Sequence, residues 1–200
     1  MPRHTEGDYH GGLARQTQDI VLISEANRMV GAAQKDVVHR CGLLHRAFSI
    51  FLTDAEGRFL LQRRSRSKYH SGGLWSNSCC GHPRPGERVL TGARRRVFEE
   101  LGVTANLTFR FYARYSVALN NNMYENELVY VYSGPIKNTP VPDPDEIEEI
   151  KYLSFAEIGQ YIHSHPQEIS YWMRHYFKAH WLSMEEISAS VEKPLGYRKP

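Results

Sequence analysis

The sequence contains no long apolar run, and this absence excludes a helical membrane protein. No stretch of the 200 residues approaches the roughly 20 consecutive apolar residues that a membrane-spanning helix needs. The N-terminus carries polar and acidic residues, including Glu6 and Asp8, and lacks the apolar core of a secretion signal. We therefore expect a soluble, cytoplasmic protein that does not bind membranes.

Cysteine and net charge are also scarce. The chain has three cysteines, of which Cys79 and Cys80 are adjacent, so it has no disulfide framework and we expect reduced thiols. The formal net charge is only +3, and no run of lysine and arginine is long enough for a nucleic-acid-binding arm. The basic clusters at 63–68 and 94–96 are short, which suits a small anionic substrate better than a polymer.

The size of the chain favours one domain. A chain of 200 residues, 41% of them hydrophobic, can bury one substantial core but hardly two. We assign this core to residues 18–187. The polar segment 1–17 and the tail 188–200 lack apolar periodicity, so we expect both to be loosely ordered.

Short apolar runs and turn residues predict the strands of a sheet. The residues Asp54 to Gly57 are typical of a hairpin turn between two of these runs. The predicted strands lie at 19–24, 47–53, 59–62, 107–119, 127–132 and 147–153.

Helices are predicted between and after these strands. The apolar residues of 89–101 recur every fourth residue, which defines the buried face of a helix that ends at Gly102. Ser154 and Glu157 form a capping box that predicts the start of a second helix. The aromatic stretch 171–181 predicts a third. Strands interleaved with helices favour an α/β fold, an α/β/α sandwich with a mixed sheet.

The two adjacent thiols lie in the segment that is richest in residues able to take part in a reaction. A free cysteine is most often a small buried hydrophobe, and for Cys79 we keep that interpretation. Cys80 differs because Gly81, His82 and Pro83 follow it, and these residues are unsuited to a core strand. Alternation along an extended backbone directs the two thiols to different faces, so we predict a functional Cys80 and a packing Cys79.

Two glutamates suggest a cation site. Glu125 and Glu127 lie two residues apart at the start of a strand, so both side chains point to one face. Like charges on one face repel unless a cation joins them. Taken alone, the pair could equally be a solvated sheet edge.

The segment that follows Cys80 resembles the Nudix signature. That signature consists of a glycine, a glutamate six residues later, and a charged helix that ends in Glu-Glu-x-Gly. In hydrolases of the superfamily, one helical glutamate helps to hold the magnesium ions that act on a diphosphate, and Arg96 stands at that position here. The resemblance therefore implies a Nudix domain whose hydrolytic site is altered. The matching residues are Gly81, Glu87, Arg95, Val97, Glu99, Glu100, Gly102 and Val103.

A narrower resemblance covers residues 18–182. The stretches 76–83, 125–127 and 171–173, which read SNSCCGHP, ENE and YWM, are similar to type I isopentenyl diphosphate:dimethylallyl diphosphate isomerase. The resemblance implies a Nudix-like α/β/α sandwich with a mixed sheet. It also implies an enzyme of isoprenoid biosynthesis that moves a carbon–carbon double bond by protonation and deprotonation through a tertiary carbocation.

The same resemblance implies the roles of individual residues. Cys80 and Glu127 transfer protons on opposite faces of the substrate, Tyr115 assists Glu127, and Trp172 stabilises the carbocation. The diphosphate is expected to bind Lys35, Arg64, Lys68 and Arg96, with Mg²⁺ at Glu100. A second divalent metal, Zn²⁺ or Mn²⁺, with Mg²⁺ also compatible with such donors, is expected at His39, His45, His82, Glu125 and Glu127. The spacing from His39 to His45 is one residue shorter than in bacterial members, so His39 is the ligand with the least support.

Two other functions remain open at this point. A Nudix hydrolase of nucleoside or sugar diphosphates is supported by the box but not by Arg96, and it leaves the Cys80 segment without a purpose. A catalytically silent Nudix domain for ligand sensing or protein binding is the other. For the isomerase we expect a small allylic or homoallylic diphosphate as the only partner, and a monomer or weak dimer.

Overall fold

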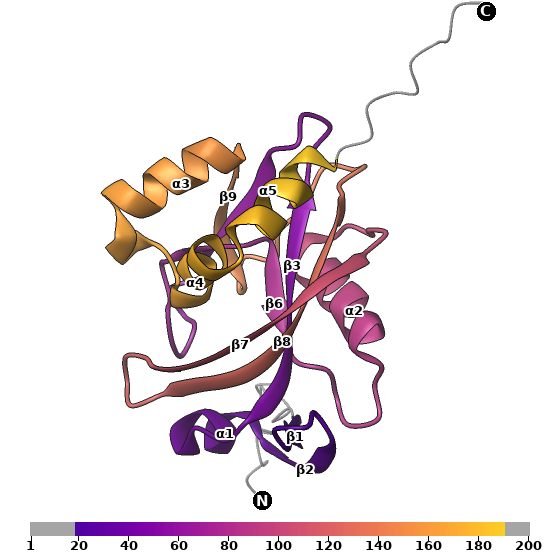
Figure 1. Cartoon of the computed structure of the whole chain (residues 1–200), viewed down its shortest axis with the longest axis vertical. Coiled ribbons are helices and arrows are strands. Elements are labelled where there is room, and N and C mark those ends of the chain that lie inside the picture. The colour runs from indigo at the N-terminus through magenta and orange to yellow at the C-terminus, as the bar shows by residue number, and fades with distance from the viewer. Residues whose placement is uncertain (1–18, 191–200) are drawn as a thin grey trace, which may run out of the picture.

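A mixed β-sheet with helices on both sides forms the structure. The computed structural model describes residues 19–190 (Figure 1). The strands are β1 (Asp19–Ile23), β2 (Met29–Gln34), β3 (His45–Thr53), β4 (Phe59–Arg64), β5 (Trp75–Ser76), β6 (Cys79–Gly81), β7 (Thr108–Ala118), β8 (Tyr124–Pro135) and β9 (Ile147–Leu153). The helices are α1 (Lys35–Cys41), α2 (Val89–Leu101), α3 (Phe155–Ser164), α4 (Tyr171–Ala179), α5 (Trp181–Ala189) and the 3₁₀ turn η1 (Pro166–Glu168).

Strand β3 is the centre of the sheet. It pairs in parallel with β8 along its whole length, from His45 opposite Glu127 to Thr53 opposite Pro135. Strand β6 pairs antiparallel with its middle part, and β1 with its first residue. The predicted hairpin between β3 and β4 exists, but only Thr53 and Phe59 pair across it, because β6 takes the edge of β3 further along. The predicted mixed sheet is confirmed.

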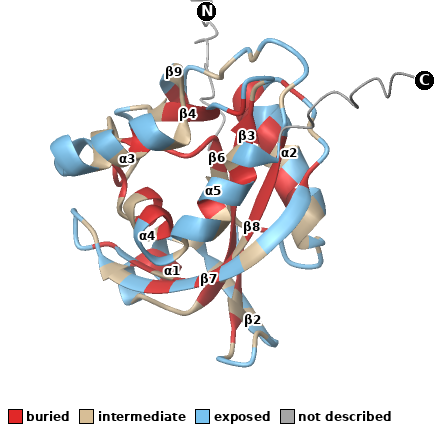
Figure 2. Ribbon diagram, turned by 45° about the horizontal axis from the view of Figure 1, so that its top comes forward, coloured by how far each residue is buried: buried red, intermediate tan, exposed pale blue. Residues whose placement is uncertain are grey.

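Two apolar cores lie on the two faces of this sheet. Phe48, Ile50 and Leu52 of β3 pack with the buried side of α2, whereas Ala47 and Phe51 pack under α3, α4 and α5. Figure 1 shows α2 on one side of the strands and α3–α5 on the other, and Figure 2 shows that the central strands are buried. A strand covered on both faces is expected to be largely apolar, and after its first two residues β3 is apolar except for the buried Ser49 and Thr53. The layers match the predicted α/β/α sandwich.

The three predicted helices are present in the structure. Helix α2 ends at Gly102, whose positive φ of 66° suits glycine. Helix α3 has the capping box, with Ser154 and Glu157 each bonding the other's backbone amide. The third predicted helix, at 171–181, exists as α4, but it ends at Ala179, two residues earlier than predicted. The backbone leaves helical geometry at His180, whose ring stacks on Phe111 at 4.4 Å, and α5 begins at Trp181.

Some elements were not predicted from the sequence. Strand β2 is mostly exposed, so it has no apolar alternation that would indicate a strand. Helix α1 has only seven residues, and β5 and β6 have two and three, so they are too short to show a period. Helix α5 extends to Ala189, two residues into the segment predicted as a tail. The predicted segment 1–17 and the rest of that tail lie outside the described residues, whose helices are all too short or too polar to cross a membrane.

The close approach of β8 to a loop generates a stability prediction. A Cβ at Gly134 would lie 2.3 Å from the backbone oxygen of Asn106. Gly134→Ala should therefore lower the free energy of unfolding by about 1–3 kcal/mol, because the backbone has to move. The control is Gly31→Ala in β2, where a Cβ meets nothing within 4 Å. Urea denaturation of both variants tests this, and equal stability of the two would contradict it.

Candidate active site

One cavity collects most of the residues predicted for the site. It lies beside the ends of β3, β6 and β8. Of the sequence-predicted residues, only His39 and His45 do not line it, since both are fully buried behind the two glutamates. The lining residues are Lys35, Phe48, Ser49, Arg64, Lys68, Tyr69, His70, Cys80, Gly81, His82, Arg96, Glu100, Tyr115, Glu125, Glu127, Glu146 and Trp172.

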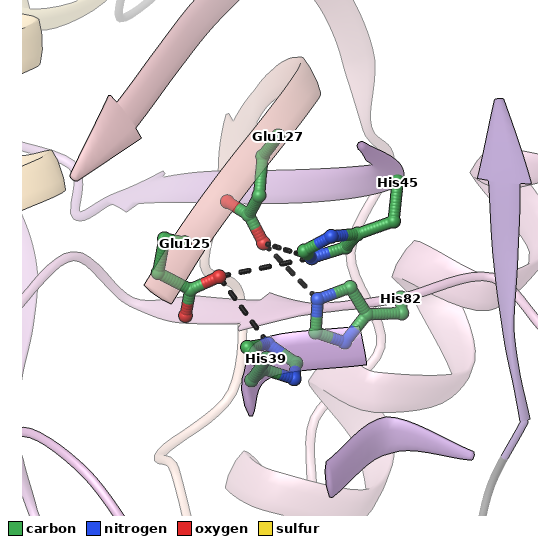
Figure 3. A group of neighbouring side chains, drawn as sticks. All are labelled: His39, His45, His82, Glu125 and Glu127. Atoms are coloured by element: carbon green, nitrogen blue, oxygen red, sulfur yellow. Dashed lines mark hydrogen bonds and ion pairs between the residues drawn. The ribbon is translucent and has the colours of Figure 1, made fainter. Parts of the chain in front are cut away.

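Three histidines and two glutamates converge at one end of this cavity. Figure 3 shows the five side chains, whose potential ligand atoms all lie within 4.8 Å of one another. The two glutamates share a face of β8, and the parallel register places His45 directly beside Glu127. The imidazole Nε2 atoms of His45 and His82 lie 3.3 and 3.0 Å from Oε1 of Glu127. The Nε2 atom of His39 lies 3.2 Å from Oε2 of Glu125.

The hydrogen bonds behind two of these rings orient them as metal ligands. The Nδ1 atom of His39 lies 2.6 Å from the carbonyl oxygen of Lys35, and that of His45 lies 2.8 Å from the carbonyl of Leu43. A carbonyl can only accept, so each Nδ1 carries a proton, and in a neutral ring the lone pair of Nε2 then faces a carboxylate oxygen. Two lone pairs facing each other repel unless a cation lies between them.

Unsatisfied atoms support the same conclusion. Nε2 of His39 and Oε2 of Glu125 are buried, and neither has a hydrogen-bond partner among the described residues. Burial acts to raise the pKa of Glu125, but the neighbouring His39 and His70 outweigh it and hold that pKa well below its ordinary value. An ionised carboxylate with an orphaned oxygen is costly in a core. Imidazole and carboxylate donors together suit a divalent ion, so these five residues could hold one.

The shorter spacing between His39 and His45 is accommodated by the end of α1. Gly42 follows this helix with a positive φ of 61°, so the chain reverses within a few residues and returns to start β3 at His45. The side chain of Asn126, which lies between the two glutamates, donates to the carbonyl oxygen of Gly42 at 2.8 Å. His39, the predicted ligand with the least support, therefore lies within the group.

The two adjacent thiols point to opposite faces of the sheet. Strand β6 is extended, so Cys79 packs in the core under α2 and Cys80 faces the cavity. The Cys80 sulfur lies 3.1 Å from Oδ1 of Asn77 and 3.3 Å from Oγ of Ser49. Burial raises the pKa of Cys80 to about 12, so the group is a protonated thiol at neutral pH.

Glu127 is the second residue for which the sequence analysis predicted a role in proton transfer. The hydroxyl of Tyr115 donates to its Oε2 at 2.5 Å, while its Oε1 faces the imidazoles. Burial and the charge of Glu125 act to raise the pKa of Glu127, but the close imidazoles of His45 and His82 leave that pKa below its ordinary value. The cavity thus contains a protonated acid and an ionised base on different strands, as proton relocation requires.

Trp172 closes the cavity from α4. Its indole nitrogen donates to Oγ of Ser76 at 2.7 Å and to Oδ1 of Asn77 at 3.1 Å. Asn77 therefore accepts bonds from both the indole and the Cys80 thiol, and this fixes their relative position. The guanidinium carbon of Arg64 lies 5.3 Å from the centre of the indole ring, so one face of the ring already attracts a cation.

The opposite end of the cavity is basic. Burial, with the charges of neighbouring cations, lowers the pKa of both Lys35 and Lys68 to about 8. Lys68 pairs with Glu146, and Arg96 pairs with Glu100 at 2.5 Å and with Glu146 at 3.3 Å. Cations that depress one another's pKa form a site for an anion of more than one charge.

The environment of Glu100 restricts its predicted role. It is 4% exposed, its Oε1 is held by Arg96, and its Oε2 accepts from Gln62 at 3.1 Å. A magnesium ion at Glu100 has to displace one of these donors. Arg95 and Glu87 form a second ion pair of the box at 2.9 Å, away from the cavity, and that pair is structural.

Sequence reasoning missed several residues of the site. Ser49 lies within a core strand, and Tyr69, His70 and Glu146 lie in loops without periodicity, so no pattern marked them. The one available signal was the position of His70, two residues after Lys68 and directly before a Ser-Gly-Gly turn. Asn77 could have been found from its place in the stretch 76–83, which carried the family resemblance.

Comparison with known proteins identifies the family. The sequence matches the NUDIX domain family over residues 43–180. It is 43% identical to isopentenyl-diphosphate Delta-isomerase 1 of Aromatoleum aromaticum over 154 residues, which are 77% of this chain and 87% of that protein. It is 40% identical to isopentenyl-diphosphate Delta-isomerase of Pectobacterium atrosepticum, over 78% of this chain and 87% of that protein. The chain belongs to the isopentenyl-diphosphate Delta-isomerase family.

Solved structures show the same fold at lower identity. The crystal structure of DR0079 from Deinococcus radiodurans aligns with a TM-score of 0.60 and 19% identity, over 74% of this chain and 90% of that one. A MutT protein from Methanosarcina mazei aligns with a TM-score of 0.56 and 19% identity, over 75% of this chain and 96% of that one. The predicted Nudix fold and the resemblance to the isomerase family are thus confirmed.

The histidine and glutamate group generates a metal prediction. Adding Mn²⁺ or Zn²⁺ at 100 times its dissociation constant should stabilise the metal-free protein by about 2.7 kcal/mol, because the ion binds the folded state. This corresponds to a rise in melting temperature of about 5–10 °C. His45→Ala should abolish the rise, whereas His163→Ala, at an exposed site on α3, should retain it. A melting temperature of the unmodified protein that no divalent ion changes would refute the assignment.

Proposed function

We propose that this cavity interconverts isopentenyl diphosphate and dimethylallyl diphosphate by moving one proton to the substrate and another away from it. The observation that carries the proposal is the pairing, in one buried cavity, of a protonated Cys80 with an ionised Glu127 beside a cluster of cations. The family membership supports the same reaction. This isomerisation requires an acid and a base next to the hydrocarbon part of the substrate, and a site that binds its diphosphate.

The reaction proceeds by protonation first. In one direction, the Cys80 thiol donates its proton to the terminal methylene carbon of isopentenyl diphosphate, and the positive charge forms on the tertiary carbon. The Glu127 carboxylate removes a proton from the carbon between that centre and the oxygen-bearing carbon, and the new double bond forms there. In the reverse direction the two groups exchange roles. Tyr115, which donates to Glu127, assists the return of the proton.

The carbocation is the least stable species on this path. Trp172 is 4% exposed and held by two hydrogen bonds, so its ring is positioned before the charge forms. A desolvated aromatic ring stabilises a cation by about 2 kcal/mol. The ring of Tyr115, which also lines the cavity, is 6% exposed, so both aromatic side chains lie away from bulk solvent.

The diphosphate binds at the basic end. Lys35, Arg64 and Lys68 supply its charge complement, and Arg96 adds a fourth cation from α2. Mg²⁺ beside Glu100 would add further positive charge. A divalent ion at the five-residue group would keep both of its carboxylates ionised when bound. Anchored in this way, the substrate keeps its diphosphate through the reaction. We place this activity in the cytoplasm, in a monomer or weak dimer that uses a small diphosphate and neither nucleic acid nor membrane.

The first test of this proposal separates the two thiols. Proton transfer by a positioned group contributes about 10²–10⁴-fold, so Cys80→Ala should lose at least 10²-fold in kcat with little change in substrate affinity. Cys79→Ala removes only a small packing group from the core under α2 and should keep nearly full kcat with slightly lower stability. Steady-state kinetics with isopentenyl diphosphate measures both. Similar losses in the two variants, or a fully active Cys80→Ala protein, would remove the thiol from the mechanism.

The second test concerns the alternative activity of a Nudix domain. Arg96 occupies a position where hydrolases hold metal with a carboxylate, so neither isopentenyl diphosphate nor a nucleoside diphosphate derivative should release phosphate or pyrophosphate at any Mg²⁺ concentration. A colorimetric phosphate assay run beside product analysis decides this. Hydrolytic turnover of about 1 per second or more would overturn the proposal in favour of a hydrolase.

A further inference from the structure

Glu125 and Glu127 belong to the ligand group, which consists of His39, His45, His82, Glu125 and Glu127. In both glutamates the two carboxylate oxygens contact different sets of partners. Glu127 directs Oε1 to His45 and His82 and gives Oε2 to the hydroxyl of Tyr115. Glu125 directs Oε2 to His39 and to His45, and its Oε1 lies 3.2 Å from Nε2 of His70. Each carboxylate therefore has one oxygen facing the group and one oxygen held from outside it.

His70 lies within ion-pair distance of that outer oxygen. It is 5% exposed, and its Nδ1 lies 3.3 Å from Oγ of Ser71. A serine hydroxyl can donate to Nδ1, which leaves the ring proton on Nε2, toward the Glu125 carboxylate. A carboxylate accepts and cannot donate, so this is the arrangement of protons in which both ring nitrogens are satisfied.

The backbone conformation of Ser71, directly after His70, is unusual for a serine. Four non-glycine residues between 19 and 190 have a positive φ, and three of them are asparagines, which tolerate it. The fourth is Ser71, at φ 52°. This conformation costs free energy for a serine, and such costs persist where the surroundings fix the chain. Here the conformation places the Ser71 hydroxyl against His70.

We propose that His70 is a positioning residue for the metal group, which holds Glu125 by its outer oxygen so that the inner oxygen faces the ion. The inference rests on the metal part of the proposed function. A carboxylate on a flexible side chain can rotate away from an ion, and a fixed second partner removes that freedom. His70 acts on Glu125 as Tyr115 acts on Glu127, and neither is among the five ligands.

The same residue links the metal group to the basic end of the cavity. The Arg64 guanidinium lies 3.4 Å from the carbonyl oxygen of His70, and the ring of Tyr69 meets the His70 ring at 4.4 Å between centroids. Lys35 in turn lies 4.9 Å from the Tyr69 ring centre. The segment from Arg64 to Ser71 thus carries both a cation of the basic end and the histidine that faces Glu125.

The experiment measures Co²⁺ binding by the metal-free full chain, using the visible absorption of the bound ion. His70→Leu keeps the approximate volume and removes the donor, and it should weaken Co²⁺ affinity about 10–100-fold. His70→Gln is the matched control, because its amide nitrogen can reach the position of Nε2 and donate. That variant should remain within a few-fold of the unmodified protein and give the same absorption spectrum.

Each outcome decides the question. Equal Co²⁺ affinity of His70→Leu and the unmodified protein overturns the inference. Equal weakening in His70→Leu and His70→Gln also overturns it, because a donor then does not suffice and the imidazole itself is needed as a ligand. If His70→Leu does not fold, His70→Ala, which adds no apolar bulk, takes its place. Failure of the unmodified protein to bind Co²⁺ removes the metal group, and this inference falls with that part of the proposed function.

Discussion

The site depends on the parallel pairing of β3 with β8. These strands are separated by 70 residues of chain, 54–123, and their register sets His45 beside Glu127. Because side chains alternate along a strand, a shift of one residue would turn both Glu125 and Glu127 to the other face. The register is fixed by burial, since β3 is apolar on both faces and each face has its own core. The positions of the ligand-group side chains therefore depend on apolar packing along the rest of β3, at residues outside the group.

The same alternation separates structure from chemistry at β6. This strand has three residues, yet it lies between the α2 core and the cavity, so Cys79 and Cys80 meet opposite environments. Asn77 lies two residues before this strand, is fully buried, and donates to the carbonyl oxygens of Ile50 and Cys79. Its oxygen is thereby aimed at Cys80 and Trp172. One amide thus sets the relative position of the proposed acid and the proposed aromatic partner of the carbocation.

Local signals explain which parts of the fold could be predicted from the sequence. Helix α2 carries a four-residue apolar period and was predicted close to its observed bounds, and the capping box of α3 predicted where that helix begins. The break at His180 depends on stacking with Phe111, a contact between distant segments that no local pattern contains. The paired glutamates indicated a cation site because two like charges on one face need a partner. His70 could not be predicted, because its role follows only from the oxygen of Glu125 that it meets.

The substitution at Arg96 combines two consequences in one side chain. Where the superfamily's hydrolases have a carboxylate that holds magnesium, this chain has a guanidinium, so a negative charge is replaced by a positive one. Under the proposed function, the change removes a ligand for the ions that promote cleavage, and it adds a cation for the diphosphate to bind. Arg96 forms ion pairs with Glu99, Glu100 and Glu146, which hold its guanidinium at the basic end of the cavity. A diphosphate that enters the cavity can replace these carboxylates as the ion-pair partner of Arg96. The guanidinium does not have to change its orientation for this. The residue that weakens hydrolysis is thus the one that favours retention of an uncleaved substrate.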